Sequence, residues 1–289
     1  MKYLFAGLLF SILWASASVA TKIGLESVPP LFLATCRFFI AGMLLLTYAI
    51  IRGQYRRPTP KEWKQLSIFG LLNTTVYLSL YVYAMKYTAA GIGSLAVSTN
   101  PLLIVLLSAW LMGRKASIKE WIGIILGIAG VYLATIPLLE EGHTTSFGLL
   151  LLGLSMLAVS FASVYYAQIQ WHLPNILING WQVTLGGLFL LPFTLLTTNV
   201  QDVHLDTNFW YGVLWLSIGV SVFGLICWFY LLKIDTVKAA LWLFLCPIFG
   251  FFYAWWLMDE PITWYTLLGS LLVIFGLYLS QTRKLRVKT

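Results

Sequence analysis

The feature that most constrains this chain is an internal repeat of long apolar segments. Trp110 recurs 146 residues later as Trp256, and the same offset relates the pairs Pro101/Pro247, Gly123/Gly269 and Gly130/Gly276. The matching segments are apolar and about one bilayer thickness long. We therefore expect two related halves, 1–139 and 140–289, each of which is a bundle of membrane-spanning helices.

Composition supports a membrane protein with little else attached. Hydrophobic residues make up 60% of the 289 residues and charged residues only 10%, whereas soluble domains are about a quarter charged. The sequence predicts an all-α polytopic protein with ten transmembrane helices, over residues 3–23, 31–51, 64–84, 91–112, 120–138, 147–168, 176–197, 210–231, 238–258 and 262–281. The remaining length leaves no room for a soluble catalytic or nucleotide-binding domain. The basic segments are short and adjoin spans, so nucleic-acid binding is not expected.

The first 23 residues could also be interpreted as a cleaved signal peptide. Lys2 precedes an apolar run and a small-residue stretch at 15–20, which is the pattern of such peptides. Cleavage would leave nine spans and would remove the partner of 147–168 in the repeat. We therefore expect the first span to be retained.

Charge distribution predicts the orientation of the spans. With the N-terminus in the cytoplasm, 15 of the 18 Lys and Arg residues lie on the inner side, in or beside 2, 52–64, 114–119, 233–238 and 283–288. Acids gather on the other side, at 26, 140–141, 202, 206 and 259–260. Both termini are then cytoplasmic. Since each half has five spans, the halves are inverted around a two-fold axis in the membrane plane, with a central cavity between them, as in many secondary transporters. The alternative is a duplicated bundle with a purely structural role.

Several motifs together resemble the EamA-type members of the drug/metabolite transporter superfamily. They are Trp14-Ala15-Ser16, Lys22-Ile23-Gly24-Leu25, Pro29-Pro30, Arg37-Phe38, Thr88-Ala89-Ala90, Asn100-Pro101, Trp110 to Gly113, Lys238-Ala239-Ala240, Pro247, Met258-Asp259-Glu260-Pro261 and Gly269 to Gly276. The resemblance covers nearly the whole chain. It implies export or exchange of small metabolites through a central cavity. One departure is Arg114, which stands where the family has an acid equivalent to Glu260.

Polar and aromatic side chains at helical spacing within spans are candidates for lining the cavity, because polar groups facing lipid are costly. As substrate-binding residues we expect Trp14, Ser18, Asn73, Tyr77, Tyr81, Asn100, Ser163, Tyr166, Trp228 and Trp242. Helix packing is the alternative for each single serine, and interhelical hydrogen bonding is the alternative for the stripe from Asn73 to Tyr81. The tryptophans either wall the cavity or pack against other helices.

Two prolines and one arginine stand out inside the spans. Pro101 and Pro247 occupy equivalent repeat positions, so they predict paired helix breaks near the binding region, or static kinks. Arg37 lies about two turns from the outer end of its helix, and its repeat equivalent is Gln182. A structural role by snorkelling is the favoured interpretation. The partners considered are helix carbonyls, Glu26 or a substrate carboxylate.

The function predicted from these patterns is a secondary transporter, an exporter or exchanger working by alternating access. No acid lies within a span, so no proton-carrying carboxylate is expected in the cavity. A neutral aromatic cavity suits amino acids or related amphipathic compounds. The alternatives are a facilitative, channel-like pathway and a non-transporting scaffold. Neither an enzyme constellation nor a metal or cofactor motif is found. We expect a monomer, rather than a dimer, in a bacterial inner (plasma) membrane.

Overall fold

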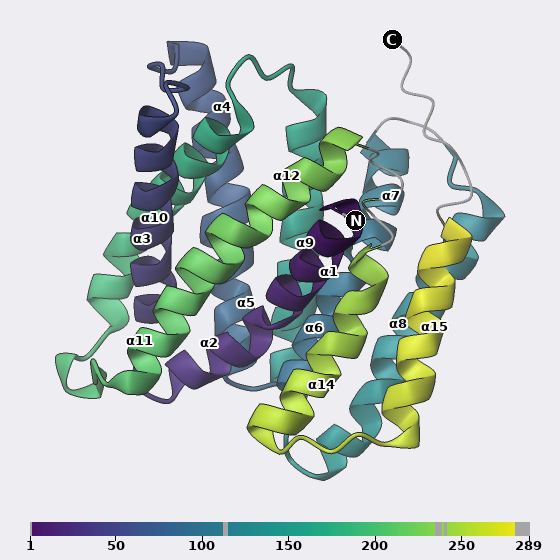
Figure 1. Ribbon diagram of the computed structural model, residues 1–289. Helices are drawn as coiled ribbons and strands as arrows, with labels where there is room; N and C mark the ends of the chain where they lie inside the picture. Colours follow the sequence, from purple (N-terminus) through teal and green to yellow (C-terminus); the bar gives the residue numbers. More distant parts are fainter. Residues whose placement is uncertain (1, 112–114, 235–238, 240–241, 281–289) are drawn as a thin grey trace.

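The computed structural model describes residues 2–111, 115–234, 239 and 242–280, and these residues form helices and loops without strands (Figure 1). Eight helical segments are long and apolar enough to cross a membrane, and two shorter apolar helices follow at Trp242–Met258 and Trp264–Ser280. The prediction of an all-helical polytopic protein with ten helices is confirmed. Arg114, Lys238 and the basic residues after 280 lie outside the described residues.

Five spans make up the first half. In chain order they consist of α1 (Lys2–Ala15) with α2 (Ala17–Leu25), α3 (Pro30–Ile51), α4 (Pro60–Gly70) with η1 (Leu71–Val76) and α5 (Tyr77–Met85), α6 (Ala90–Ser98) with α7 (Asn100–Leu111), and α8 (Ile118–Glu140). The second half consists of α9 (Ser146–Gln168), α10 (Asn175–Thr197), the short η2 (Val200–Asp202), α11 (Thr207–Leu214) with η3 (Trp215–Gly224) and α12 (Leu225–Ile234), η4 (Trp242–Leu245) with α14 (Cys246–Met258), and α15 (Trp264–Ser280).

Short polar side chains start several of these helices. Thr59 and Glu62 form a capping box at the start of α4, and Ser117 and Glu120 form another at α8. In each box, the hydroxyl accepts a backbone N–H while the carboxylate accepts the N–H of the capping residue, so orphan donors at the helix end are satisfied. Both boxes lie in segments that the charge pattern predicts to be cytoplasmic.

The turns after α5, α8 and α14 lie together at one end of the bundle, at the bottom of Figure 1. Backbone N–H of Thr145 donates to the Tyr87 carbonyl at 2.9 Å, and Ala90 N–H donates to Glu260 Oε1 at 2.6 Å. Segments 140–145 and 260 therefore share one face. We call this end the outer end, following the orientation that the charges predict.

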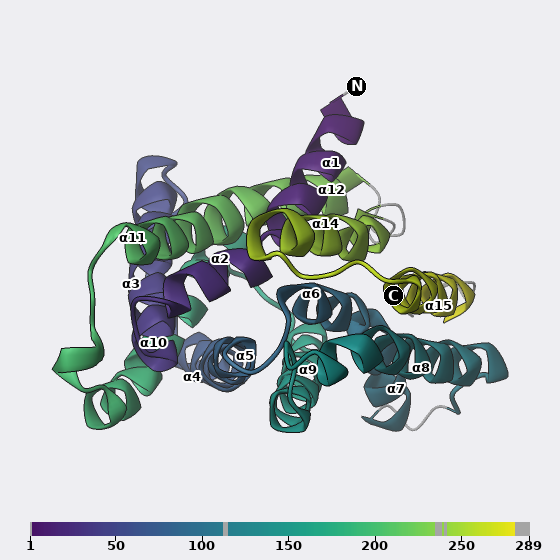
Figure 2. The same ribbon diagram turned by 90° about the horizontal axis from the view of Figure 1, so that it is seen from below.

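Helices of the two halves pair as a two-fold axis requires. The equivalent helices α3 and α10, α6 and α14, and α8 and α15 contact each other, and the α1–α12 contact is matched by the α5–α9 contact (Figure 2). The closest approach lies between α8 and α15. A Cβ on Gly123 would lie 2.6 Å from the Gly276 carbonyl oxygen, and one on Gly130 would lie 2.5 Å from that of Gly269. Because Gly269 and Gly276 are the repeat equivalents of Gly123 and Gly130, these two contacts exchange under the two-fold axis.

Candidate functional site

A cluster of polar side chains lies buried where α2, α3, α5 and η3 meet. We call it the central cluster, and its members are Ser18, Arg37, Tyr77, Tyr81, Ser217 and Ser221. The Ser18 hydroxyl and the Tyr81 phenol are 2.9 Å apart and hydrogen-bonded. The rings of Tyr77 and Tyr81 lie 6.2 Å apart. Four spans from both halves therefore contribute to one polar site.

Arg37 supplies the charge of this cluster. Its side chain is only 6% exposed, and it lies within electrostatic range of the phenols of Tyr77 and Tyr81. Its Nε and Nη2 donate to the Ser221 hydroxyl at 3.4 and 3.3 Å. The guanidinium therefore contacts η3 in the second half of the protein. Glu26, one partner considered above, instead accepts a hydrogen bond from Asn208 at 2.8 Å.

Ser221, the hydrogen-bond partner of Arg37, lies in the π-helical segment η3. In η3, the Ser221 hydroxyl donates to the carbonyl of Leu216, five residues earlier, at 2.9 Å, and the Ser217 hydroxyl donates to the Arg37 carbonyl at 3.3 Å. The equivalent span of the first half contains a second π-helical segment, η1. Such widened turns are rare and frequently occur at functional sites.

The two π-helical segments make equivalent contacts. In the first half, Thr74 and Asn73 donate to Gln182 Oε1 at 2.7 and 3.3 Å. Gln182 is the repeat equivalent of Arg37. Each half therefore places one polar residue of its second span against the π-helical segment of the other half. One of these residues is a neutral amide and the other is a cation.

The expected substrate-binding residues fall into separate groups. Ser18, Tyr77 and Tyr81 meet at the central cluster with Arg37. Asn73 donates to Gln182 instead, which is the interhelical hydrogen bonding named above as the alternative for this residue. Ser163 donates to the Val159 carbonyl of its own helix at 2.7 Å. Tyr166 stacks on Trp171, with ring centroids 5.4 Å apart, near the start of α10. Asn73 and Tyr166 therefore have their partners outside the central cluster, and the Ser163 hydroxyl bonds within its own helix.

The three deep tryptophans lie along α1, against Gly7 and Phe10. Trp228 stacks on Phe10 with centroids 4.8 Å apart, and Trp14 lies 5.5 Å from the same ring. Trp242 packs directly on Gly7, where a Cβ would overlap its indole ring. Its carbonyl accepts the Ser11 hydroxyl at 2.8 Å. These aromatic side chains join α1 to α12 and η4.

Both spans that contain the predicted breaks are interrupted at equivalent residues. The fourth span changes from α6 to α7 at Thr99, beside Asn100 and Pro101. In the ninth span, α14 begins with Cys246 and Pro247 after η4 ends at Leu245, which lies 146 residues beyond Thr99. The Ser94 hydroxyl donates to the Cys246 carbonyl at 3.0 Å, so the first half contacts the interruption in the second. Asn100 Oδ1 accepts from Ser160 at 3.5 Å.

At the outer end, one buried carboxylate joins the two halves. Glu260 is 4% exposed and accepts the backbone N–H groups of Ala90 and Gly91, at 2.6 and 3.0 Å. Lys22 Nζ lies 3.5 Å from Glu260 Oε1 and donates to the Thr88 carbonyl at 2.9 Å. A carboxylate at a helix N-terminus satisfies orphan donors and complements the helix dipole. We call this arrangement the outer seal.

Local backbone geometry aims Glu260 at α6. Asp259 has a φ of 52° and ends α14 in the left-handed region, which Asp adopts more readily than most residues. The Glu260 N–H then donates to the Ala254 carbonyl at 3.1 Å. The chain turns back on the end of its own helix, so the Glu260 side chain points at the start of α6.

A second polar contact ties the halves at the outer end. The Ser27 hydroxyl donates to Asp206 Oδ1 at 2.6 Å, and the Ser27 carbonyl accepts the His204 N–H at 2.8 Å. Asp206 also caps α11 by accepting the Phe209 N–H at 3.1 Å. The hydrogen bond from Ser27, followed by that from Phe209, lowers the pKa of the Asp206 carboxyl.

The spans interrupted at Thr99 and Leu245 bury fewer residues on the inner side of the interruption than on the outer side. Eight of the nine residues of α6 are buried, but only Leu102 and Ala109 are buried among the twelve of α7. No residue of η4 is buried, whereas α14 buries five. Along these two spans, the number of buried residues therefore changes at the two helix interruptions.

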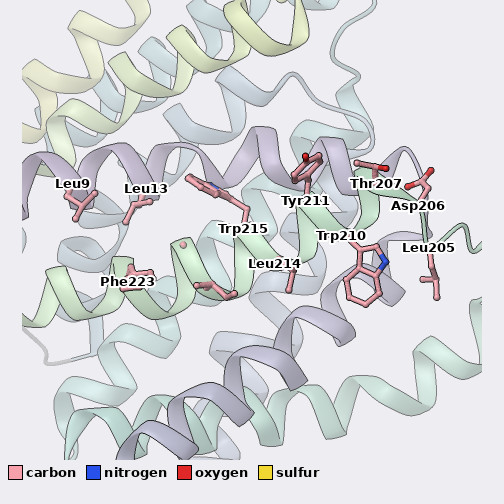
Figure 3. A pocket seen from close by; sticks show the side chains of 12 residues that line it. Leu9, Leu13, Leu205, Asp206, Thr207, Trp210, Tyr211, Leu214, Trp215 and Phe223 are labelled. Carbon is pink, nitrogen blue, oxygen red and sulfur yellow. The ribbon is translucent and has the colours of Figure 1, made fainter.

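A groove on the flank of the bundle is distinct from the central cluster. It has a volume of about 830 Å³ and lies between α1 and the α11–η3 segment (Figure 3). Leu9 and Leu13 form one wall, and the aromatic residues Trp210, Tyr211 and Trp215 lie along the other. Asp206 and Thr207 are at its outer end. An almost wholly apolar lining suits lipid chains more than a polar solute.

Comparisons with known proteins agree with this architecture. The sequence profile described as the EamA-like transporter family matches residues 1–136 and again 146–282. An uncharacterized transporter of Archaeoglobus fulgidus is 27% identical over 94% of this chain and 95% of its own length. The uncharacterized transporter YoaV of Bacillus subtilis is 24% identical over 93% of both chains. The WAT1-related protein At3g02690, chloroplastic, of Arabidopsis thaliana is 27% identical over 92% of this chain and 66% of its own. One crystal structure, 20% identical, superposes with a TM-score of 0.66 over 98% of this chain and 99% of the other.

Proposed function

Because the chain belongs to the EamA-like transporter family and is a membrane transporter, we propose that it is a secondary carrier that exports or exchanges small metabolites by alternating access. The solute binds at the central cluster, between two inverted halves with boundaries near 139 and 140. Amino acids or related amphipathic compounds are the first solutes to test. We further propose that the protein is a monomer in the inner membrane of a bacterium, with both termini in the cytoplasm.

One observation carries this proposal. The fourth and ninth spans are interrupted at equivalent residues, and they bury more residues on the outer side of the interruptions than on the inner side. A carrier that has closed its outer gate is expected to have this asymmetry, since its inner half must open to release or load solute. A scaffold has no need of paired interruptions at Thr99 and Leu245, or of polar groups buried at a midplane interface.

Residues around the central cluster suit a solute with both polar and apolar parts. Tyr77 and Tyr81 offer aromatic faces together with hydroxyls, and Ser18 and Ser221 offer small hydroxyls. Among the described residues, the buried acids Glu62 and Glu120 cap helices, and Glu260 belongs to the outer seal. None of these acids is at the central cluster. The proposed cycle therefore needs no carboxylate that carries a proton through the site.

The test is counterflow in proteoliposomes. Purified protein is reconstituted with an unlabelled amino acid inside, and uptake of the same labelled amino acid is followed for each member of a panel. Saturable uptake that Tyr81→Phe weakens is expected for a carrier. Conduction that does not saturate would favour the channel-like alternative. Absence of flux for every solute class, neutral, anionic and cationic, would favour the scaffold and refute the proposal.

A further inference from the structure

Arg37 has no acidic partner in the part of the chain that the structure describes. The ion pairs found there within 4 Å involve Lys22, Arg56 and His143. Arg37 is nevertheless 6% exposed. A buried cation is costly unless an opposite charge or a full set of hydrogen bonds compensates it. The site therefore lacks one negative charge.

The hydrogen bonds that Arg37 makes are too few to compensate for burial. A guanidinium has five N–H donors, and here Nε and Nη2 both donate to the single Ser221 hydroxyl, at 3.4 and 3.3 Å. These distances exceed the usual range for N–H···O bonds. Within the described residues, neither a helix carbonyl nor Glu26 accepts a hydrogen bond from the side chain. The fork of donors is thus held in place by a weak partner that another oxygen could replace.

The residues of the central cluster near this cation carry neutral hydroxyl groups. Tyr77 and Tyr81 from α5 lie within electrostatic range of it, and Ser18 is hydrogen-bonded to Tyr81 at 2.9 Å. Such groups can donate to an anion or accept from an ammonium group. They add no charge of their own. The net charge of the central cluster is therefore the single positive charge of Arg37.

We propose that Arg37 binds the carboxylate of the transported solute, so that the solutes of this carrier are monocarboxylates, amino acids included. The inference rests on the proposed function. A planar carboxylate matches the fork of a guanidinium and brings one negative charge to balance one positive charge. A phosphate dianion would bring a second negative charge for which the cluster has no cation, whereas the ammonium group of an amino acid can donate to the neutral hydroxyls of the cluster. In the other half, Gln182 occupies the equivalent position and is already satisfied by Thr74 and Asn73, so the site binds one carboxylate and not two.

The position of the outer seal fits this role. Lys22 follows Ser18 by one helical turn toward the outer end, so the seal lies immediately beyond the central cluster. With the seal closed, a carboxylate reaches Arg37 from the inner side. Opening of the seal would then expose the bound solute to the other face.

The experiment compares acids with their uncharged-carboxyl analogues. Purified protein is screened by thermal stabilisation against α-amino acids, 2-oxo acids and simple monocarboxylates, each paired with its carboxamide. The variants are Arg37→Gln and Arg37→Lys, with Arg52→Gln as a matched control at the exposed cytoplasmic end of the same helix. Wild-type protein should bind at least one acid about tenfold or more tightly than its amide.

Loss of that discrimination is the result expected of Arg37→Gln. The ratio of acid to amide affinity should fall to about one, Arg37→Lys should restore part of it, and Arg52→Gln should leave it unchanged. Melting temperature without solute and elution as a single species establish that each variant is folded. If Arg37→Gln does not fold, the test is the acid-to-amide affinity ratio of Arg37→Lys, which should lie between the wild-type ratio and one.

Other outcomes overturn the inference in distinct ways. An unchanged ratio in Arg37→Gln, or a wild-type protein that binds amides and amines as well as acids, would show that Arg37 does not select a carboxylate. Transport of neutral solutes that depends on Tyr81 but not on Arg37 would overturn this inference and leave the proposed carrier standing. Absence of flux for all solute classes would remove both.

Discussion

Replacement of Glu260 by Gln should weaken the interactions that hold the outer end of the protein closed. Glu260 accepts two backbone N–H groups of α6 at 2.6 and 3.0 Å and lies 3.5 Å from Lys22 Nζ. Glutamine has the same shape, but it keeps one acceptor oxygen and turns an NH₂ group toward a backbone donor. It also removes the charge that complements the helix terminus and Lys22. Because these interactions join the two halves, removing them should weaken the closed arrangement specifically.

The size of the effect follows from the interactions that glutamine cannot make. One charge-assisted hydrogen bond in a buried setting contributes about 1.5–3 kcal/mol, and the interaction with the helix dipole adds about 0.3–1 kcal/mol. Destabilisation of the outer-closed arrangement by about 2–3 kcal/mol corresponds to a shift of about 30- to 150-fold in its equilibrium with the outer-open one.

A cysteine introduced at the buried position 19 can report the equilibrium between the outer-closed and outer-open arrangements. Val19 is 2% exposed and packs with Ala90 and Ala254 between the halves, at the level of the outer seal. In a variant with Val19→Cys and without the three native cysteines, a membrane-impermeant thiol reagent added from outside should react slowly. Adding Glu260→Gln should raise the labelling rate by at least about tenfold, given the shift in equilibrium worked out above.

The matched control is Glu141→Gln. Glu141 lies at the same end and is exposed, with His143 3.8 Å away as its ionic contact, so its replacement should not change the labelling rate. An unchanged rate in a folded Glu260→Gln protein would refute the reasoning, since it would mean that these bonds do not hold the outer end closed.

Three further predictions concern packing, the central cluster and pH. Gly130→Val should destabilise the protein by about 1–3 kcal/mol, because the added side chain would push α8 away from α15. Gly153→Val is the control and should not destabilise it, because no atom lies within 4 Å of the Cβ position there. Thermal unfolding in detergent compares the two variants. Tyr81→Phe should cost about 1 kcal/mol of stability and weaken solute binding, measured by unfolding and by counterflow. The pKa of Asp206 is lower in the folded protein than in the unfolded chain. Its carboxylate therefore stabilises the fold above the unfolded pKa of about 3.9, and this contribution disappears as the pH falls through the folded value. The difference in melting temperature between wild type and Asp206→Asn should accordingly shrink below about pH 4.

Opposite results would contradict each of these in turn. Equal melting temperatures for Gly130→Val and Gly153→Val would mean that the close approach of α8 and α15 is unimportant for stability. If Tyr81→Phe transported solute as well as the wild type, the phenol hydroxyl of Tyr81 would not take part in solute binding. A pH-independent difference for Asp206→Asn would show that Ser27 does not favour the ionised carboxylate.

Much of the architecture could be predicted from apolar periodicity and the repeat. Ten long apolar runs can hardly form anything other than spans, and matching Pro101 with Pro247 indicated the level at which α6 and η4 end. The repeat pairs Gly123/Gly269 and Gly130/Gly276 could be read from the sequence, but their contact could not, since small residues permit a close approach without specifying which helix approaches.

The composition of the site could be predicted only in part, for a geometric reason. Asn73, Tyr77 and Tyr81 share a face in an α-helix, where four residues make about one turn. Asn73 lies within the π-helical segment η1, whose turns hold more residues than those of an α-helix, and its side chain donates to Gln182. Nothing in residues 71–76 marks that turn in the sequence. Likewise, the spacing of Tyr166 identified a face of α9 but not which of its neighbours that face contacts.

The reciprocal glycine contacts of α8 and α15 have a further mechanical consequence. In the proposed alternating-access cycle, one half rocks against the other, and some part of the interface has to serve as a fulcrum. Backbone touching backbone at two points, with the points interchanged by the molecular two-fold, leaves no long side chains there to rearrange between states. The resistance to motion is thus concentrated at the outer end of the bundle, where a handful of hydrogen bonds at Lys22, Glu260 and Asp206 can govern it.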